Sequence, residues 1–362
     1  RYPEAHPHSP WSMLELKRTP ETNIFDMIRE KDLLIHLPYE SFDESVVNFL
    51  YSAANDKDVL AIKQTLYRVS SSSPVVQALE KAVQNGKQVT VLMEVKARFD
   101  EANNILMARR LEKAGAHVIY GLVGLKTHSK CTLVIRREKD GIRRYVHVAT
   151  GNYNASTAKL YTDLGILTCS DRFGIDASAF FNLLSGYSDP PIWDSFIVAP
   201  INLRQRCIEL IDREIHFAKN GEDAHMIAKM NSLLDKGIIE KLYEASQAGV
   251  KIELIVRGIC VLIPGIPGVS DNITVRSIVG RFLEHSRIFW FRNGGREELY
   301  ISSADWMPRN LNDRVELMVP IEDPEIKRRL KQMVDIELSD NQKAHIMPVS
   351  YTHLRAHETK AN

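Results

Sequence analysis

A short polar motif occurs twice in this chain, and its repetition limits how the chain can fold. His128-Ser-Lys130 opens an apolar segment that is typical of a strand, and His285-Ser-Arg287 opens another one in the second half. In both halves, strand and helix patterns precede the motif in the same order, and a tight turn follows it. A chain of 362 residues that repeats a whole unit in this way is expected to form two related domains.

Each half predicts a mixed sheet covered by helices. In the first half, strand patterns at 59–68 and 89–95 alternate with helical spacing at 75–84 and 103–114, and Asp140-Gly141 is a hairpin turn. This order predicts an α/β fold. The second half repeats it, with strands at 225–231, 250–256, 288–291 and 299–302, a helix at 236–247 and a turn at 293–295.

The domain boundaries follow from the repeat and from a Pro-rich turn. The turn at 189–191 joins the two halves, and we place the boundary near residue 195. Residues 31–195 then form the first domain, and residues 196–347 form the second. Residues 1–30 are rich in Pro and His and then polar, which indicates the remnant of an upstream region and a linker.

Composition and charge exclude several classes of protein. A net charge of +1 provides no global basic field, so a polyanionic partner requires local clusters of positive charge, and we expect no nucleic-acid partner. The four cysteines are far apart and have no C-x-x-C spacing, which indicates reduced thiols and a cytoplasmic location. The most apolar stretch, 250–269, contains charged residues and Gly/Pro breaks, so it does not read as a membrane span.

The motif residues suit phosphoryl chemistry. Two apart at the start of a strand, His128 and Lys130 point to the same face. An imidazole can attack phosphorus while an ammonium holds the phosphate oxygens. If the two domains face each other, His285 reaches the same cleft as an acid, a base or a charged clamp. Asp163 and Asp305 are candidates for orienting a histidine through a hydrogen bond.

Further candidates for ligand binding follow the predicted strands. Arg68, Arg98 and Arg257 come at strand ends, where the ligands of open α/β sheets gather, and arginine binds phosphate in a bidentate way. Tyr161 is either a core aromatic residue or a face for a base or ribose.

Several longer motifs resemble polyphosphate kinase of the first type. This resemblance implies two tandem phospholipase-D-like domains, each a mixed β-sheet flanked by helices. It also implies reversible transfer of the γ-phosphate of ATP to the end of an inorganic polyphosphate chain. The motifs are 61–68, 94–101, 121–130, 150–154, 160–163, 256–264 and 282–288.

Carried over by position, the resemblance implies a role for each candidate residue. His128 matches the histidine that becomes phosphorylated, with Lys130 beside it. The residues expected to contact ATP and its phosphates are Tyr161, Arg257, His285 and Arg287. Arg68 and Arg98 match arginines of a magnesium–phosphate site. Because Mg²⁺ takes oxygen ligands, we expect both arginines to hold the phosphates that the metal bridges.

The resemblance also carries expectations about partners and about the extent of the chain. The substrates would be ATP or ADP and polyphosphate, with Mg²⁺ as cofactor. The whole protein would be a homo-oligomer, with a possible peripheral place at the inner membrane. The family has two further domains upstream, so the chain would be a fragment. Residues 348–362 depart from the family and resemble translated adapter sequence, so we expect a non-native tail there.

Two alternatives stay open at this point. A phospholipase-D-type phosphodiesterase acting on lipid or nucleic acid would share the paired histidines, although Arg287 stands where those enzymes usually carry lysine. A catalytically impaired phosphate-binding fragment would contain the same residues without turning over substrate.

Overall fold

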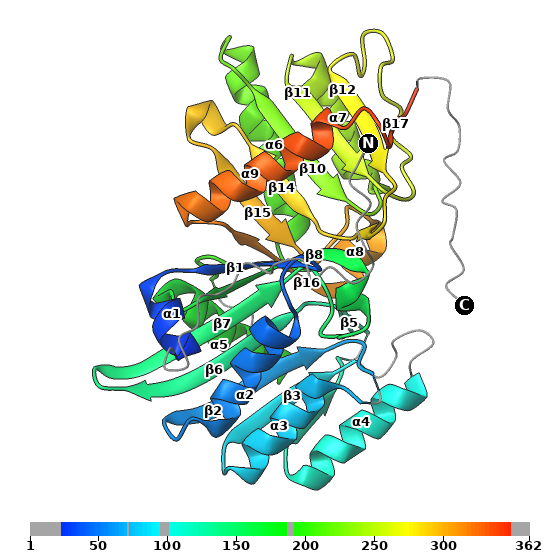
Figure 1. Cartoon of the computed structure of the whole chain (residues 1–362). Helices are drawn as coiled ribbons and strands as arrows, with labels where there is room; N and C mark the ends of the chain where they lie inside the picture. Colours follow the sequence, from blue (N-terminus) through cyan, green and yellow to red (C-terminus); the bar gives the residue numbers. More distant parts are fainter. Residues whose placement is uncertain (1–22, 71, 95–100, 123, 187–191, 349–362) are drawn as a thin grey trace.

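Two β-sheets, one from each half of the chain, form the framework of the computed structural model (Figure 1). The structure describes residues 23–70, 72–94, 101–122, 124–186 and 192–348. Arg98 and the expected tail, apart from Pro348, lie outside these residues. No helix in the described part of the chain is both long and apolar enough to cross a bilayer.

The first sheet contains its strands in the order β1-β8-β7-β6-β2-β3-β4. β2, β3 and β4 run parallel and are joined by helices, as crossover connections require. Helices α1 to α4 cover one face of the sheet, and α5 lies on the other. The bounds are α1 (Ile24–Glu30), β1 (Leu33–Leu37), η1 (Asp43–Val47), α2 (Asn48–Asn55), β2 (Val59–Leu66), α3 (Pro74–Gln84), β3 (Gln88–Met93), α4 (Glu101–Ala114), β4 (His117–Tyr120), β6 (Cys131–Glu138), β7 (Gly141–Ala149), η2 (Thr157–Lys159), β8 (Tyr161–Thr168) and α5 (Asp171–Leu184).

The second sheet has the order β17-β12-β11-β10-β14-β15-β16-β5, with β9 beside β16. Its parallel strands β10, β11 and β12 correspond to β2, β3 and β4. Helices α6 and α7 cover one face, and α9 lies on the other. The bounds are β9 (Ile197–Ala199), α6 (Leu203–Lys219), β10 (His225–Met230), α7 (Lys236–Gln247), β11 (Lys251–Val256), β12 (Ile273–Ile278), β14 (Ile288–Phe291), η3 (Asn293–Gly295), β15 (Glu298–Ser302), α8 (Pro308–Asn312), β16 (Arg314–Pro320), α9 (Pro324–Ser339) and β17 (Ala344–Ile346).

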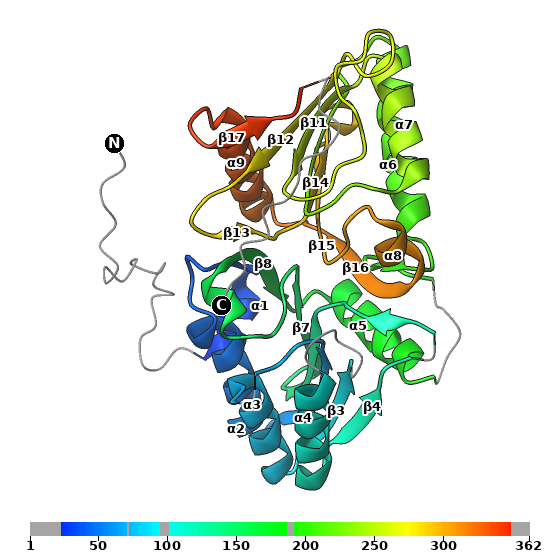
Figure 2. The same ribbon diagram turned by 90° about the vertical axis from the view of Figure 1, so that its right-hand side faces the viewer.

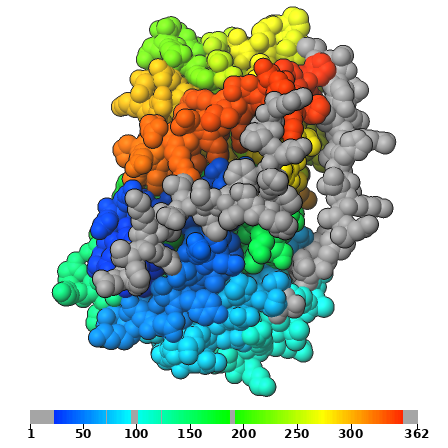
Figure 3. All heavy atoms as spheres, in the orientation of Figure 1, coloured from blue at the N-terminus to red at the C-terminus, as the bar shows by residue number. Residues whose placement is uncertain are grey.

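A third hydrophobic core joins the two halves. It contains Phe180 from α5, Phe196 from the connecting segment, Ile227 from β10, Trp290 from β14 and Leu330 from α9, all of them buried. Figure 2 shows the second half seated on the first, and in Figure 3 the orange-to-red surface of α9 lies directly above the blue surface of the first half. Because their apolar faces share this core, the two halves pack as one unit.

Each half also contributes a two-residue strand to the sheet of the other half. β5 (Lys126–Thr127) pairs in parallel with β16, and β13 (Leu283–Glu284) pairs in parallel with β8. Each of these short strands immediately precedes a motif histidine. Both motifs are therefore held at the junction of the two sheets, next to the backbone of the opposite half.

The predicted α/β fold of two related sheets is confirmed, and α7 and β14 have the predicted bounds. One difference concerns the segment 1–30, which we expected to precede the first domain. Asn23 caps α1 within that segment, and Ile24, Phe25 and Ile28 are buried in the core of the first half. Helix α1 is thus part of the first domain, because its apolar face completes that core.

Candidate active site

The backbone of the second half fixes the position of the first motif. The N–H groups of His128 and Ser129 both donate to the carbonyl of Val315 in β16, each at 2.9 Å. Glu94, just after β3, accepts the N–H of Thr127 at 2.9 Å. These bonds hold His128 where the chain leaves the second sheet and enters β6 of the first.

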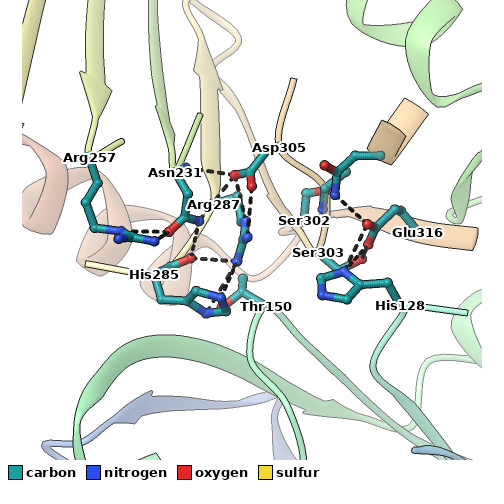
Figure 4. A network of polar contacts seen from close by, with 12 residues as sticks. His128, Thr150, Asn231, Arg257, His285, Arg287, Ser302, Ser303, Asp305 and Glu316 are labelled. Carbon is teal, nitrogen blue, oxygen red and sulfur yellow. Dashed lines mark hydrogen bonds and ion pairs between the residues drawn. The ribbon is translucent and has the colours of Figure 1, made fainter. Parts of the chain in front are cut away.

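A carboxylate from the second half orients the His128 ring (Figure 4). Nδ1 of His128 lies 2.9 Å from both carboxylate oxygens of Glu316. The Ser303 hydroxyl and the Asn310 amide donate to the same carboxylate. Because donors surround Glu316, it acts as the acceptor, and Nδ1 carries the proton. Nε2 of His128 then has an available lone pair, and it makes no hydrogen bond to any described residue.

The surroundings of His128 keep its ring neutral. Burial lowers the pKa of His128 well below its usual value, and the charges of Lys130, Arg314 and Arg287 lower it further. The Tyr67 ring packs edge-on against the imidazole, with 4.7 Å between the ring centroids. A neutral, restrained imidazole with an available Nε2 is the nucleophilic form of histidine.

Lys130 is buried beside His128. Its ammonium group donates to the backbone carbonyl of His128. Burial lowers the pKa of Lys130 to about 7, with Glu316 opposing this shift and Arg287 adding to it. Over the described ranges, no carboxylate forms an ion pair with Lys130. A buried ammonium of this kind is well placed to bind an anionic ligand.

The first half holds the second motif in the same manner. Nδ1 of His285 lies 2.8 and 3.0 Å from the two carboxylate oxygens of Asp163 in β8. Thr150 Oγ1 donates to Asp163 at 2.6 Å. Gly151 lies so close that a Cβ atom there would be 2.2 Å from Asp163 Oδ2. Each motif histidine is therefore oriented by a carboxylate from the opposite domain.

Arg287, the cation of the second motif, is anchored by a carboxylate. Its Nε and Nη2 lie 3.0 and 3.1 Å from the two oxygens of Asp305, in a bidentate pair. Its Nη1 lies 3.2 Å from Nε2 of His285. Burial would raise the pKa of Asp305, but Arg287 outweighs that effect, and the pKa falls to about 2. The prediction that Asp305 orients a histidine is wrong, since its carboxylate is bound by Arg287 and by the N–H of Asn231.

Tyr161 and Arg257 lie beside the second motif. The ring centroids of Tyr161 and His285 are 5.2 Å apart. Arg257 Nε donates to Oδ1 of Asn231 at 2.8 Å, and the Asn231 amide donates to the carbonyl of His285 at 3.0 Å. Burial and the charge of Arg287 lower the pKa of Arg257. The charge of Arg287 also lowers the pKa of His128 in the first motif. The residues around the second motif therefore form one site with the first motif.

The structure brings most of the candidate residues together. Arg68 follows β2, and its guanidinium lies 5.8 Å from the ring centroid of Tyr67, the residue whose ring contacts His128. Arg98 lies outside the described residues, so its place stays a prediction. The candidates that meet at the domain junction are His128, Lys130, Tyr161, Arg257, His285 and Arg287.

Sequence reasoning missed Glu316 and Arg314. Both lie in β16, an apolar strand in which Glu316 is completely buried. A charged residue inside a buried strand is rare without a partner, and this is the signal that could have found Glu316. Its partner could not have been identified, because the pairing joins two distant parts of the chain.

The charged side chains at this junction fit phosphates better than a metal ion. Mg²⁺ takes oxygen ligands, whereas the carboxylates at this junction already bind His128, His285 and Arg287, and the other groups are imidazoles, an ammonium and guanidinium groups. In the described part of the chain, no group of three or more His, Cys, Asp or Glu side chains could hold a metal ion. The described residues therefore do not form a magnesium site of their own.

Comparison with known proteins gives consistent results over nearly the whole chain. The family "Polyphosphate kinase C-terminal domain 1" matches residues 23–190, and "Polyphosphate kinase C-terminal domain 2" matches residues 196–362. The polyphosphate kinase of Halalkalibacterium halodurans is 60% identical over 90% of this chain, and that of Synechocystis is 57% identical over 89%. These matches cover 46% and 44% of the two relatives, so the chain spans about half their length.

Solved structures agree with these matches. The polyphosphate kinase of Porphyromonas gingivalis matches with a TM-score of 0.86 and 40% identity, over 96% of this chain and 53% of that one. A phosphatidylserine synthase of Haemophilus influenzae matches over 88% of this chain and 87% of that one, with a TM-score of 0.57 and 11% identity, which shows a shared fold alone. By the two domains that it matches, the chain belongs to the polyphosphate kinase family.

Proposed function

We propose that this chain carries the catalytic centre of a polyphosphate kinase, which transfers the γ-phosphate of ATP reversibly to the end of a polyphosphate chain. The observation that carries the proposal is the state of His128. Its ring is neutral, its Nδ1 is held by Glu316, and its Nε2 is available beside the buried ammonium of Lys130. This is the arrangement that a covalent phosphate carrier requires.

The first half-reaction is the attack of Nε2 of His128 on the γ-phosphorus of ATP. An N–P bond forms, the bond between the γ-phosphorus and the bridging oxygen breaks, and ADP leaves with that oxygen. The proton on Nδ1 stays in place, and the Glu316 carboxylate balances the positive charge of the phosphorylated ring. Lys130 and Arg287 stabilise the negative charge on the phosphoryl oxygens.

The second half-reaction restores the free histidine. A terminal oxygen of polyphosphate attacks the phosphorus, an O–P bond forms and the N–P bond of His128 breaks. The electron pair returns to Nε2, so no proton has to be exchanged. The same steps in reverse would make ATP from ADP and polyphosphate.

We place the nucleotide on the side of the second motif. Tyr161 offers an aromatic face next to His285, and Arg257 is held nearby through Asn231. Because Nδ1 of His285 donates to Asp163, a neutral His285 has no proton on Nε2 and can only accept a hydrogen bond there. Donation of a proton by His285 to the leaving group would require the protonated ring, so the two roles differ in their dependence on pH.

Metal and phosphate binding around Arg68 and Arg98 are part of the same proposal. Since the described residues do not form a metal site, we propose that Mg²⁺ binds as a complex with the substrate phosphates and that these arginines hold those phosphates. Self-association and contact with a membrane surface concern the whole protein and stay predictions.

The test measures formation of ADP from ATP with and without added polyphosphate, beside hydrolysis of a phosphodiester without ATP. We expect ADP formation that depends on polyphosphate and no phosphodiester hydrolysis. Hydrolysis without ATP would favour a phosphodiesterase. Retention of radiolabelled polyphosphate on a filter without any ADP formation would favour an idle phosphate-binding fragment.

A further inference from the structure

Lys229, near the end of β10, is a buried charge outside both motifs. Its side chain is 2% exposed, and its ammonium lies 2.7 Å from Oε2 of Glu284. It also pairs with Glu337 in α9. Burial alone would lower the pKa of Lys229, but the two carboxylates outweigh that effect and raise it. Lys229 is thus a stable buried cation. Because burying a charged side chain costs free energy that apolar packing would avoid, its presence here indicates a specific role.

The contacts of Lys229 lead directly to the second motif histidine. Glu284 is the residue before His285, and its Oε2 also accepts the hydroxyl of Thr162 at 2.9 Å. Thr162 precedes Asp163, the carboxylate that orients His285. The chain of contacts from Lys229 through Glu284 to Thr162 therefore joins the second sheet to the first at the point where this histidine meets its carboxylate.

The internal repeat shows an equivalent position in the first half. In β2, the residue before Thr65 pairs with Thr132 of β6, and Thr132 comes four residues after the first motif histidine. In β10, the residue before Lys229 pairs with Phe289 of β14, and Phe289 comes four residues after the second motif histidine. Thr65 and Lys229 therefore have the same place in the two sheets, next to their respective motifs.

Both of these residues bond the segment that contains the motif. Thr65 Oγ1 donates to the carbonyl of Ser129 at 2.9 Å and accepts the N–H of Cys131 at 2.9 Å. In the second half, Lys229 holds Glu284 instead. We propose that Lys229 is a positioning residue for His285 and that it acts through Glu284 and Thr162, as Thr65 acts on the first motif. The catalytic meaning of this role rests on the proposed function, but the geometric role does not.

The weak pairing of β13 explains why the second half uses a charged residue, Lys229, where the first half uses Thr65. β13 is only two residues long and pairs with a strand of the other domain, so its backbone bonds give it little stability. An ion pair in a buried site resists displacement, because separating the charges leaves them unpaired in a low-dielectric region. Without Lys229, Glu284 would move toward water, and His285 would lose its fixed distance from Asp163.

The test uses the ¹⁵N resonances of the imidazole rings of the full chain, assigned by their loss in His128→Ala and His285→Ala. We expect Lys229→Met to shift the His285 resonances and leave those of His128 in place. Thr65→Val, the matched variant of the first half, should do the reverse. Unchanged His285 resonances in folded Lys229→Met, or equal shifts of both histidines, would overturn the proposal. This readout needs no activity, so a failure of the proposed function is detected separately.

A second variant keeps the proposal testable if Lys229→Met does not fold. Thr162→Val removes one hydroxyl from the same contact chain without leaving a buried charge unpaired, and it should also shift the His285 resonances alone. Absence of such a shift would contradict the proposed contact chain.

A double-mutant cycle adds a kinetic measurement. In an active chain, Lys229→Met should lower the rate about tenfold in the natural background and much less in the background of His285→Ala, since interacting residues are non-additive. An equal loss in both backgrounds would show that Lys229 acts on overall stability rather than on His285. Arg136→Met, which removes ion pairs with Asp56 and Glu138 far from the motifs, is the control for general loss of stability.

Discussion

The two motifs of this chain have the same backbone setting and different chemistry. In each, a short strand pairs with the opposite half, and a carboxylate of that half binds Nδ1 of the histidine. Their cations differ. Lys130 has no carboxylate partner within the described residues, whereas Arg287 is bound by Asp305 on two atoms.

This difference separates two roles that a repeated motif would otherwise share. An ammonium without a paired carboxylate can take a phosphoryl oxygen as its partner, and it lies beside the available Nε2 of His128. A guanidinium that is already paired keeps its position and can contribute charge without moving. We therefore assign the covalent step to the first motif and the positioning of the substrate to the second.

The largest expected effect separates the two carboxylates. Glu316→Gln keeps the size of the side chain but removes the charge that fixes the tautomer of His128. We expect the rate of ADP formation to fall about 10³- to 10⁴-fold, since loss of the carboxylate that orients a catalytic histidine costs about 10⁴-fold in serine proteases. Asp163→Asn, the matched change in the second motif, should lower it only about 10- to 100-fold, because the proposed mechanism gives the covalent bond to His128 and not to His285. Equal sensitivity of the two positions, in variants with unchanged melting temperatures, would contradict the assignment.

A smaller effect is expected when the second motif alone is displaced. In Gly151→Ala the new Cβ atom would lie 2.2 Å from Asp163 Oδ2, so the carboxylate must move and His285 loses its partner. We expect a fall of about tenfold in kcat/KM for ATP. Gly280→Ala is the control, since no atom lies within 4 Å of a Cβ there. The measurement is steady-state kinetics at varied ATP concentration. An unchanged kcat/KM in Gly151→Ala would show that Asp163 has no part in the reaction.

The smallest expected effect is on the pH dependence of kcat/KM, and it arises from Lys130, the cation of the first motif. The pKa of Lys130 is lowered to about 7, so the free chain loses this positive charge as the pH rises through that value. We expect kcat/KM to decrease above about pH 7, because the neutral amine no longer binds phosphate. In Lys130→Arg the charge persists, so this alkaline decrease should disappear even if the rate at pH 6 is several-fold lower.

The acid side of the same profile provides the control. The pKa of His128 lies well below its usual value, so its neutral form persists at pH 6, and the activity should not fall in step with an ordinary histidine. If the natural chain and Lys130→Arg showed the same decrease of kcat/KM at alkaline pH, a group other than Lys130 would be titrating there.

Local patterns were sufficient to predict much of the fold and the two motifs. Strand and helix periodicity, with turns such as Asp140-Gly141, predicted most of the elements before the first motif, and β10, α7 and β11 before the second, but not α6 or β12. Helix α9 was missed, although Asp323 caps it and Ile326, Leu330 and Val334 follow at helical spacing. Strand β8 was missed for a different reason. It is buried on both faces and therefore lacks the alternation that indicates a strand.

The partners of the motif residues could not be predicted in the same way. Glu316 meets His128 because β5 joins the second sheet, and Asp163 meets His285 because β13 joins the first. Such exchanges depend on how two complete sheets pack, and no local pattern of two residues signals them. Asp163 was still among the candidates for orienting a histidine, whereas Asp305 was given that role wrongly, because a carboxylate near a histidine can equally bind the neighbouring arginine.

The most direct test of the account is transfer of label from γ-labelled ATP to the protein. We predict acid-labile label on the natural chain, reduced but detectable label on His285→Ala, and none on His128→Ala, with all three chains shown to be folded by circular dichroism. Label that persists on His128→Ala at the level of the natural chain would contradict the account.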